Sequence, residues 1–436
     1  MSGLDIARLD SSAADFESRF TRLIGRHQAE DEAVVARAQS IVEQVRREGD
    51  TALVRLTAEL DRREVASVAD LEVPRSQMQA ALDALPAAAR QALEDSAARL
   101  RDYAERQRLH EWRYADEHGN ELGQVVRPLA CVGVYAPGGK AAYPSTVLMN
   151  SVPAQVAGVE QIVLVSPAPG GELNPMVLAA AALAGVHRMF TIGGAQAVAA
   201  LAWGTDAVPC VDKIVGPGNA YVAAAKRIVF GRVGIESIAG PSEVLVLADG
   251  RSDPAWAAMD LFAQAEHDEA ARAILISPDA GFLDRVHEAA AQALAAQPRR
   301  QIIAASLAAE GALIKVRDMD EAVALSNRIA PEHLELAVDE PDDLLPHIQH
   351  AGAIFMGAYT PESFGDYCAG PNHVLPTGRT ARFSSPLGVY DFQKRLSLIK
   401  ASPQGMRALA PTVAEMARGE GLEAHARSAE LRSEDR

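Results

Sequence analysis

The sequence predicts an α/β protein with two parallel-sheet lobes, a helical lead-in at the N-terminus and a helical tail at the C-terminus. Two series of short apolar runs, divided by Gly or Pro turns and by helical stretches, predict parallel strands that are covered by helices. One series begins near Leu122 and the other at Glu243. Helical periodicity before and after the two series predicts the lead-in and the tail.

The N-terminal quarter is predicted to be helical. Residues 1–28 are expected to form an N-terminal helical segment. From Glu30 to about Trp112, apolar residues recur at three- and four-residue spacing, as in DEAVVARAQSIVEQVRRE, and Pro86 can begin the long run that follows. No cluster of chemically active side chains occurs in this quarter, so we predict no site there.

The two apolar series supply the predicted strands. In the first series the runs are ACVGVYAP, QIVLVSP, RMFTIGG and DKIVGPG, with helices expected at 173–184, 195–203 and 220–230. In the second series the runs are EVLVLAD, RAILISP, GALIKV, HLELAV and GAIFMG. The boundary between the lobes is expected at 238–243, because Gly and Pro break the pattern there. The two series share the alternation of apolar runs and helical stretches but not their residues, so an internal duplication remains open.

The C-terminal segment, from about Val389, returns to a helical pattern with few strong apolar anchors and many charges. Composition alone leaves two interpretations, a solvated tail or a segment that packs on another surface. Glu420 and His425 lie in this tail, and on composition they belong to a solvated helix.

Length and composition bound the class of protein. At about 100 to 200 residues a domain, 436 residues predict roughly three domains. The net charge of −16 and an aromatic content of 5% argue against nucleic acid as a partner. Three scattered cysteines predict a reducing compartment. No apolar signal region and no run of about 18 apolar residues occur, so we expect a soluble, cytoplasmic protein that does not enter membranes.

Gly-rich turns follow three strands of the first series, at 137–140, 193–196 and 216–219. Such turns at the carboxyl ends of parallel strands expose backbone N–H groups that bind phosphates. None of them matches G-x-G-x-x-G, and tight turns need Gly in any case. Nucleotide binding and a purely structural role therefore both remain open.

Three polar motifs contain candidate metal-binding and acid–base residues. Gln264 and His267 share one helix face at spacing i, i+3, although a lone helical His is more often a packing residue. Glu332-His333 follows Pro331 at a turn, where a carboxylate beside an imidazole can supply a base. Asp366 lies in the polar loop after the last strand. The same loop contains His373, which can contact substrate.

A metal site is the interpretation that joins several of these positions. The N/O donor set, which lacks thiolate, suits Zn²⁺ or Mn²⁺ better than a structural Cys site. The set comprises Gln264, His267, Asp366 and His425.

Ordered motifs over nearly the whole chain resemble the histidinol dehydrogenase family. They are GVYAPGG (133–139), GGAQ (193–196), VGPGN (215–219), AGPSE (239–243), QAEH (264–267), APEH (330–333) and GDY (365–367), with Asn372 and His373 just after. The family they resemble is a homodimeric, zinc-containing, NAD-dependent enzyme of histidine biosynthesis. It oxidises L-histidinol to L-histidine in two steps through an aldehyde.

The resemblance implies a role for each matching residue. The implied zinc ligands are Gln264, His267, Asp366 and, from the partner subunit, His425. The implied catalytic pair is Glu332 and His333. The implied substrate contacts are Ser242, His373 and, from the partner, Glu420, together with the ligands and the catalytic pair. The implied NAD contacts are Tyr135, Gln196 and Asn219.

The resemblance also implies an architecture. The sheets would be Rossmann-like but incomplete, which explains the missing dinucleotide fingerprint, and the C-terminal tail would be exchanged in a homodimer. The expected units are an N-terminal segment (1–28), a lobe with the zinc and catalytic residues (29–137 and 243–386), an NAD-binding lobe (138–242) and a helical dimerisation segment (387–436).

The implied mechanism uses one base twice. His333 would remove the alcohol proton as hydride leaves for NAD⁺, Glu332 would activate water on the aldehyde, and zinc would orient the substrate.

Three other interpretations of the sequence compete with this one. The first is the oxidation of another primary alcohol, such as a sulfonated diol, on the same scaffold. The others are a metal hydrolase without NAD and a non-catalytic binding protein. The tail residues together with His373 favour histidinol, and Gln196 and Asn219 argue against the hydrolase.

Overall fold

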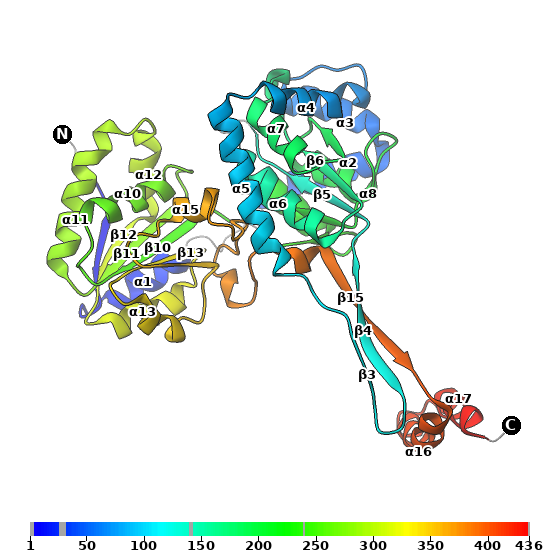
Figure 1. The fold of residues 1–436 in the computed structure, drawn as a ribbon. Helices are drawn as coiled ribbons and strands as arrows, with labels where there is room; N and C mark the ends of the chain where they lie inside the picture. Colours follow the sequence, from blue (N-terminus) through cyan, green and yellow to red (C-terminus); the bar gives the residue numbers. More distant parts are fainter. Residues whose placement is uncertain (1–3, 26–31, 139–142, 239, 435–436) are drawn as a thin grey trace.

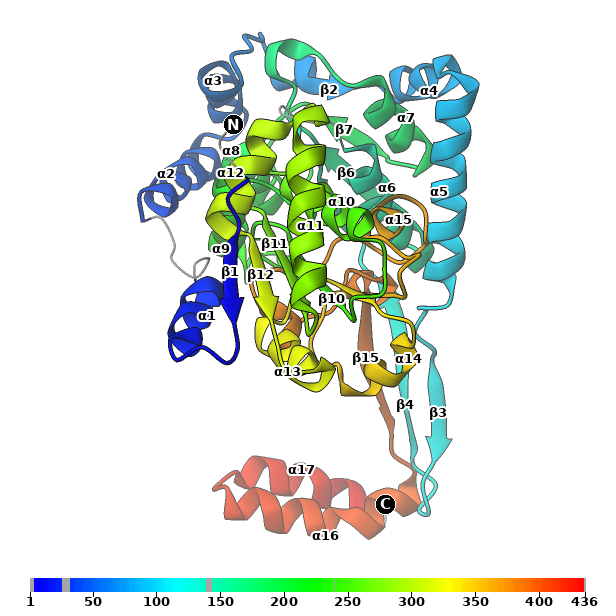
Figure 2. The same cartoon turned by 90° about the vertical axis from the view of Figure 1, so that its left-hand side faces the viewer.

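The computed structural model describes residues 4–25, 32–138, 143–238 and 240–434. These residues form two α/β lobes side by side and a long arm that extends away from both, with a pair of helices at its tip (Figures 1 and 2). We name the lobes after their central strands, the β5 lobe and the β10 lobe. No helix in the described ranges is long and apolar enough to cross a membrane.

The β5 lobe is a six-stranded sheet in the order β2-β7-β6-β5-β8-β9, parallel except for β2. Its central order is that of a Rossmann half, in which the crossovers reverse between β5 and β8. The strands are β2 (Glu72–Val73), β5 (Cys131–Tyr135), β6 (Gln161–Val165), β7 (Arg188–Phe190), β8 (Lys213–Val215) and β9 (Gly234–Ile235).

Helices cover both faces of this sheet, so its strands are apolar on both sides. One face packs against α4 (Arg75–Ala84), α5 (Ala87–Glu105), α6 (Pro144–Ala157) and α7 (Pro175–Leu183). The other packs against α2 (Glu32–Glu48), α3 (Asp50–Asp61), α8 (Gly194–Trp203) and α9 (Ala220–Val229).

The β10 lobe repeats the same crossover pattern in the sheet β1-β12-β11-β10-β13-β14, which is parallel throughout. Here the reversal lies between β10 and β13. The strands are β1 (Ala7–Asp10), β10 (Glu243–Ala248), β11 (Arg272–Ser277), β12 (Ala312–Lys315), β13 (His333–Ala337) and β14 (Ala353–Met356). The two lobes therefore share a sheet topology as well as the alternation of strands and helices along the chain.

Helices again occupy both faces of the β10 sheet. One face packs against α10 (Pro254–Ala265), α11 (Ala280–Ala293) and α12 (Arg300–Glu310). The other packs against α1 (Phe16–Gly25) and α13 (Met319–Ile329). Two short helices follow β13 and β14, α14 (Pro341–Leu344) and α15 (Glu362–Tyr367).

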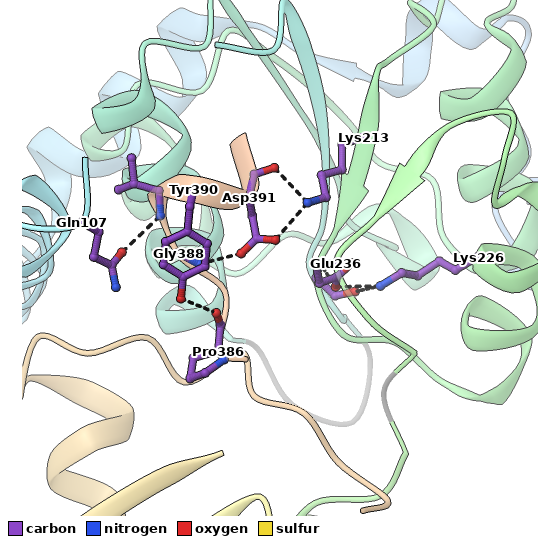
Figure 3. Close-up of polar contacts among 10 residues, drawn as sticks. Gln107, Lys213, Lys226, Glu236, Pro386, Gly388, Tyr390 and Asp391 are labelled. Carbon is purple, nitrogen blue, oxygen red and sulfur yellow. Dashed lines mark hydrogen bonds and ion pairs between the residues drawn. The ribbon is translucent and has the colours of Figure 1, made fainter. Parts of the chain in front are cut away.

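The arm is a three-stranded antiparallel sheet, β3 (Trp112–Ala115), β4 (Glu121–Pro128) and β15 (Gln393–Lys400). It carries the antiparallel helices α16 (Pro403–Gly419) and α17 (Glu423–Ser433). Its base is fixed to the β5 lobe by Lys213 of β8, whose Nζ donates to the backbone oxygen of Asp391 at 2.8 Å and to its Oδ1 at 3.0 Å (Figure 3).

The two-lobed α/β prediction is confirmed, and every predicted strand of both apolar series is present. The predicted unit bounds differ from the sheets in one respect. Residues 29–137 were grouped with 243–386, but 131–135 form the central strand of the β5 sheet, and α2 to α5 cover that sheet. The segment therefore belongs with 138–242.

Two segments predicted as wholly helical contain strands. Residues 1–28 include β1, in which only Leu9 is buried, so no apolar run marks the strand. Residues 387–436 begin with β15, which pairs with β4 over eight residues while most of its side chains remain exposed. Both strands are held by backbone pairing, which leaves little hydrophobic pattern in the sequence.

Candidate active site

The candidate acid–base pair lies at the amino end of β13. Glu332 and His333 are both buried. Ala330 ends α13 in the left-handed region, with φ 50°, and this turns the chain into the strand. Because β13 is next to β10, the pair meets the first residue of β10, Glu243, where the sheet reverses its crossovers. The site thus uses the amino ends of these strands.

The Glu243 backbone orients both members of the pair. Its N–H donates to Glu332 Oε2 at 2.9 Å, and its carbonyl oxygen lies 3.0 Å from His333 Nδ1. A carbonyl only accepts, so Nδ1 carries a proton, and Nε2 is the nitrogen at which the ring gains or loses its second proton. Nε2 is buried and makes no hydrogen bond with any residue that the structure describes. The basic nitrogen is therefore available to a ligand.

Three carboxyl groups surround the imidazole. Nδ1 lies 3.7 Å from Glu362 Oε1 and 3.8 Å from Glu332 Oε2, and Nε2 lies 3.7 Å from Asp366 Oδ1. Burial opposes a charge on His333, but the carboxylates of Glu362, Glu332 and Asp366 outweigh it and raise the pKa of His333 well above its usual range.

Burial favours the neutral, protonated form of the acids in this group. It raises the pKa of Glu332 to about 8 and that of Glu362 to about 7, although the imidazole of His333 lowers both. Burial would also raise the pKa of Asp366, but its interactions with the imidazoles of His333 and His373 lower it. Asp366 is therefore the anionic member of the group, which is the state in which a carboxyl group binds a metal.

Of the four predicted metal donors, Asp366 belongs to a cluster that could hold a metal ion, and His267 interacts with that cluster. His333, Glu362 and Asp366 can place one ligand atom each within 4.8 Å of the others. His267, near the end of α10, interacts electrostatically with Asp366 and His333, and its burial lowers its pKa, which favours the neutral, ligating form.

Gln264 is fully buried on α10. Its amide nitrogen lies 3.3 Å from the Glu243 oxygen and 3.2 Å from Glu362 Oε1 in the orientation that satisfies both acceptors. This leaves the amide oxygen as a ligand atom. The residues present therefore fit a divalent metal with N/O preference, with Gln264, His267 and Asp366 as donors.

Two predicted substrate contacts lie beside this group. His373 Nδ1 is 3.8 Å from Asp366 Oδ1, and burial lowers the pKa of His373. Ser242 immediately precedes β10, and its carbonyl oxygen accepts from Arg272 N at 2.9 Å. Both residues thus stand next to the Glu332–His333 pair or to its neighbour Glu243.

The predicted NAD contacts gather at the other reversal, at the carboxyl ends of β5 and β8. Tyr135 ends β5, and its hydroxyl oxygen accepts from Gly194 N at 3.0 Å. Gln196 is buried on α8, and its Oε1 has no hydrogen-bond partner among the described residues. Asn219 caps α9 by accepting from Tyr221 N and Val222 N at 3.1 Å each. Gly139, Lys140 and Ala239, which belong to the quoted motifs, lie outside the described residues.

Glu420 and His425 are not near this site within one chain. Glu420 follows α16 and His425 is on α17, and both helices lie at the far tip of the arm (Figure 1). The remaining predicted site residues separate into a group around His333 and a group around Tyr135.

Three buried acids at this site were not anticipated. Glu362 begins α15 and stands one helical turn before Asp366, which places both on one helix face. Glu335 lies two residues after His333 in β13, and its Oε1 accepts from Glu362 N at 2.6 Å. Asp260 of α10 hydrogen-bonds Glu335. An acidic residue within the apolar run HLELAV is the signal that could have identified Glu335.

A buried imidazole that is ringed by carboxyl groups in a two-lobed α/β fold is an arrangement typical of enzymes that use acid–base chemistry. Comparisons with known proteins place it more narrowly. The family model described as histidinol dehydrogenase matches residues 24–433. The chain belongs to the histidinol dehydrogenase family and is an oxidoreductase.

Individual relatives agree with the family model. The chain is 59% identical over 430 residues to the histidinol dehydrogenase of Dechloromonas aromatica, covering 99% of each chain. It is 60% identical over 428 residues to that of Chromobacterium violaceum, covering 98% of this chain and 99% of the relative. The crystal structure of histidinol dehydrogenase from Elizabethkingia anophelis superposes with a TM-score of 0.92 at 33% identity, covering 98% of each chain. The fold is therefore that of the family, and the similarity extends over nearly all of the compared chains.

Proposed function

We propose that the protein oxidises L-histidinol to L-histidine through L-histidinal, in two NAD-dependent steps at a zinc site. The observation that carries the proposal is the buried, unpartnered Nε2 of His333, whose ring is fixed by the Glu243 carbonyl and which stands 3.7 Å from Asp366. A base in this state can take a proton from a substrate hydroxyl.

The metal would be held by Gln264, His267 and Asp366, and by His425 of a second copy of the chain. When bound, zinc supplies a Lewis acid that orients the substrate and lowers the pKa of its hydroxyl. Glu362 supports this set from outside, because its carboxyl accepts from the Gln264 amide nitrogen and leaves the amide oxygen free.

In the first step His333 Nε2 takes the hydroxyl proton as the substrate carbon loses hydride. Fixing the ring through Nδ1 keeps Nε2 directed at the substrate. The Asp366 carboxylate, 3.7 Å from Nε2, stabilises the imidazolium that forms. The burial of this group shields the aldehyde from bulk solvent, so that the water that reacts with it is one bound beside Glu332.

In the second step water adds to the aldehyde, and Glu332 is placed to accept the proton of that water. The pKa of Glu332, about 8, lets this carboxyl exchange a proton near neutral pH. As water adds, the His333 imidazolium returns its proton to the aldehyde oxygen, so that Nε2 can take a proton from the hydrate as the second hydride leaves. One base thus serves both oxidations.

The dinucleotide would lie at the carboxyl ends of β5 and β8, against Tyr135, Gln196 and Asn219. NAD⁺, when bound, supplies the hydride acceptor for each step. The positive ends of the helix dipoles of α8 and α9 suit its phosphates and require no basic side chain, which is compatible with a net charge of −16.

The specificity of the site can be tested directly. The purified enzyme is assayed for NADH formation with L-histidinol and, separately, with a sulfonated vicinal diol at equal concentration. The proposal predicts turnover of L-histidinol only. Preferential turnover of the diol would assign the scaffold to another primary alcohol.

A further inference from the structure

A fully buried ion pair lies directly under one of the Gly-rich turns of the β5 lobe. Lys226 Nζ, on α9, is 2.6 Å from Oε1 of Glu236, which follows β9, and the two side chains are 2% and 5% exposed. Figure 3 shows the pair pointing toward each other beneath the sheet edge. A buried pair is weak evidence of stabilisation, because the desolvation of both charges offsets their attraction. Its placement points to a different role.

Both backbone polar groups of Gly216 are held by this pair. Gly216 N donates to Glu236 Oε1 at 2.7 Å, and Lys226 Nζ donates to the Gly216 oxygen at 3.2 Å. Gly216 itself has φ 108°, and a Cβ there would lie 2.0 Å from the Tyr135 backbone oxygen. The turn is therefore fixed in a conformation that only glycine adopts, in contact with the end of β5.

The two ends of the turn 216–219 are fixed by separate sets of hydrogen bonds. The pair holds Gly216 at the start, and Asn219 caps α9 at the end. Lys226 lies two helical turns after Asn219, so the same helix supplies the cap and the cation. The turn thus has a set position relative to Tyr135 and to the first N–H groups of α9.

The charge balance suits an anionic ligand. An unpaired carboxylate at Glu236 would repel phosphates at the turn, and an unpaired ammonium at Lys226 would be costly to bury. Paired, the two side chains fix the turn by charge-assisted hydrogen bonds and add no net charge.

We infer that Lys226 and Glu236 are positioning residues that hold the turn 216–219 in the conformation that binds the dinucleotide. The inference rests on the proposed NAD function of the β5 lobe. It assigns to the pair an effect on dinucleotide affinity that is separate from the chemistry around His333.

The test uses two double variants of the full-length enzyme, because a single substitution would bury an unpaired charge. Lys226→Met with Glu236→Gln removes the ion pair but keeps an acceptor for Gly216 N–H. Lys226→Met with Glu236→Met removes both. A matched control, Arg188→Met with Glu72→Gln, breaks the bidentate pair of the same sheet at the β7–β2 edge, which has no contact to the turn.

All proteins are assayed well below their melting temperatures. For the Met/Met variant we expect the KM for NAD⁺ to rise about tenfold or more, as for a misplaced binding loop, while the KM for L-histidinol and the zinc content stay near wild type. The control should keep the wild-type KM for NAD⁺, and the Met/Gln variant, which loses only the Lys226 hydrogen bond to the Gly216 oxygen, should show a smaller rise than the Met/Met variant. Hydrogen exchange at the Gly216 amide should accelerate only in the Met/Met variant.

An unchanged KM for NAD⁺ in a folded Met/Met variant would overturn the inference. So would an equal rise in both KM values with loss of zinc, since that is a global structural effect. Absence of NAD⁺ reduction by the wild-type enzyme is a different result, because it refutes the proposed function and leaves the Gly216 exchange measurement as the test of the pair.

Discussion

At the residue scale, the chemistry depends on the unpartnered Nε2 of His333. Replacement of His333 by Asn keeps a polar group of similar shape but removes the base. We expect kcat to fall by about 10²- to 10⁴-fold with either L-histidinol or L-histidinal as substrate. NAD⁺ affinity should be unchanged, since the residue lies in the other lobe. Steady-state rates of NADH formation measure the effect, and near-normal rates with both substrates would remove His333 from the mechanism.

Glu332 should affect the two oxidations unequally. Glu332→Gln keeps an oxygen that can accept the Glu243 N–H but removes the group that takes a proton from water. In a single-turnover experiment the first hydride transfer should therefore be nearly preserved, and the second should slow by about 10²- to 10⁴-fold. Rapid-quench analysis of aldehyde and acid distinguishes the two. Equal slowing of both transfers would contradict the assignment to water.

The sequence alone was enough to select most residues that meet at the site. Glu332, His333, Asp366 and His373 do lie within a few ångströms of one another. Glu362 was not predicted from the sequence. Its role depends on how α15 packs against β13, and no sequence pattern links these two segments. Its companion Glu335 has a visible signal, an acid within an apolar strand, but the partner that explains it is given only by the fold.

At the element scale, the packing of α10 against β13 buries Asp260 beside Glu335. Burial raises the pKa of Asp260 to about 6, from the ordinary value of 3.8. A raised pKa in the folded state gives stability that is full at low pH and is lost as pH rises through about 6. This contact between helix and strand therefore weakens toward neutral pH.

The substitution Asp260→Asn should remove the loss of folding stability that occurs as pH rises. At pH 7.5 we expect the variant to unfold with a free energy about 1–2 kcal/mol higher than that of wild type, and near pH 4 the difference should vanish. Thermal unfolding at both pH values checks this, with Asp83→Asn, an exposed carboxyl on α4, as control. A variant less stable than wild type at pH 7.5 would show that the ionised group contributes favourably.

Elements were predictable where burial creates a pattern. The strands of both apolar series are buried on two faces, and each appears as a continuous apolar run. By contrast β1 and β15 are held by backbone pairing at exposed positions, so the helical expectation for residues 1–28 and 387–436 was wrong in part. The assignment of 29–137 failed because sheet membership is set by pairing between distant segments.

At the scale of the whole molecule, the helices of the arm carry two predicted site residues. Glu420 and His425 lie at its tip, away from the site of their own chain. If His425 completes the zinc site of a second copy, removal of residues 419–436 should lower both zinc content and activity to near zero. Metal analysis of the truncated protein checks this, and full zinc content would exclude the shared site.

Mixed dimers test the same idea without truncation. His333→Asn and His425→Ala subunits are each expected to be inactive alone. After unfolding and refolding together, about a quarter of all sites should combine an intact His333 with an intact His425 of the other chain. A mixture of His333→Asn with Glu332→Gln is the control, because every site then keeps one defect. Equal activity in both mixtures would contradict an exchanged tail.

The central claim is that one active site carries out two successive NAD-dependent oxidations of L-histidinol. Its most direct test is the amount of NADH formed per L-histidinol consumed, followed by absorbance with and without a zinc chelator. The account predicts two NADH per substrate, no free aldehyde, and loss of activity on chelation that added zinc restores. One NADH per substrate with aldehyde released into solution, or full activity after the metal has been removed, would contradict it.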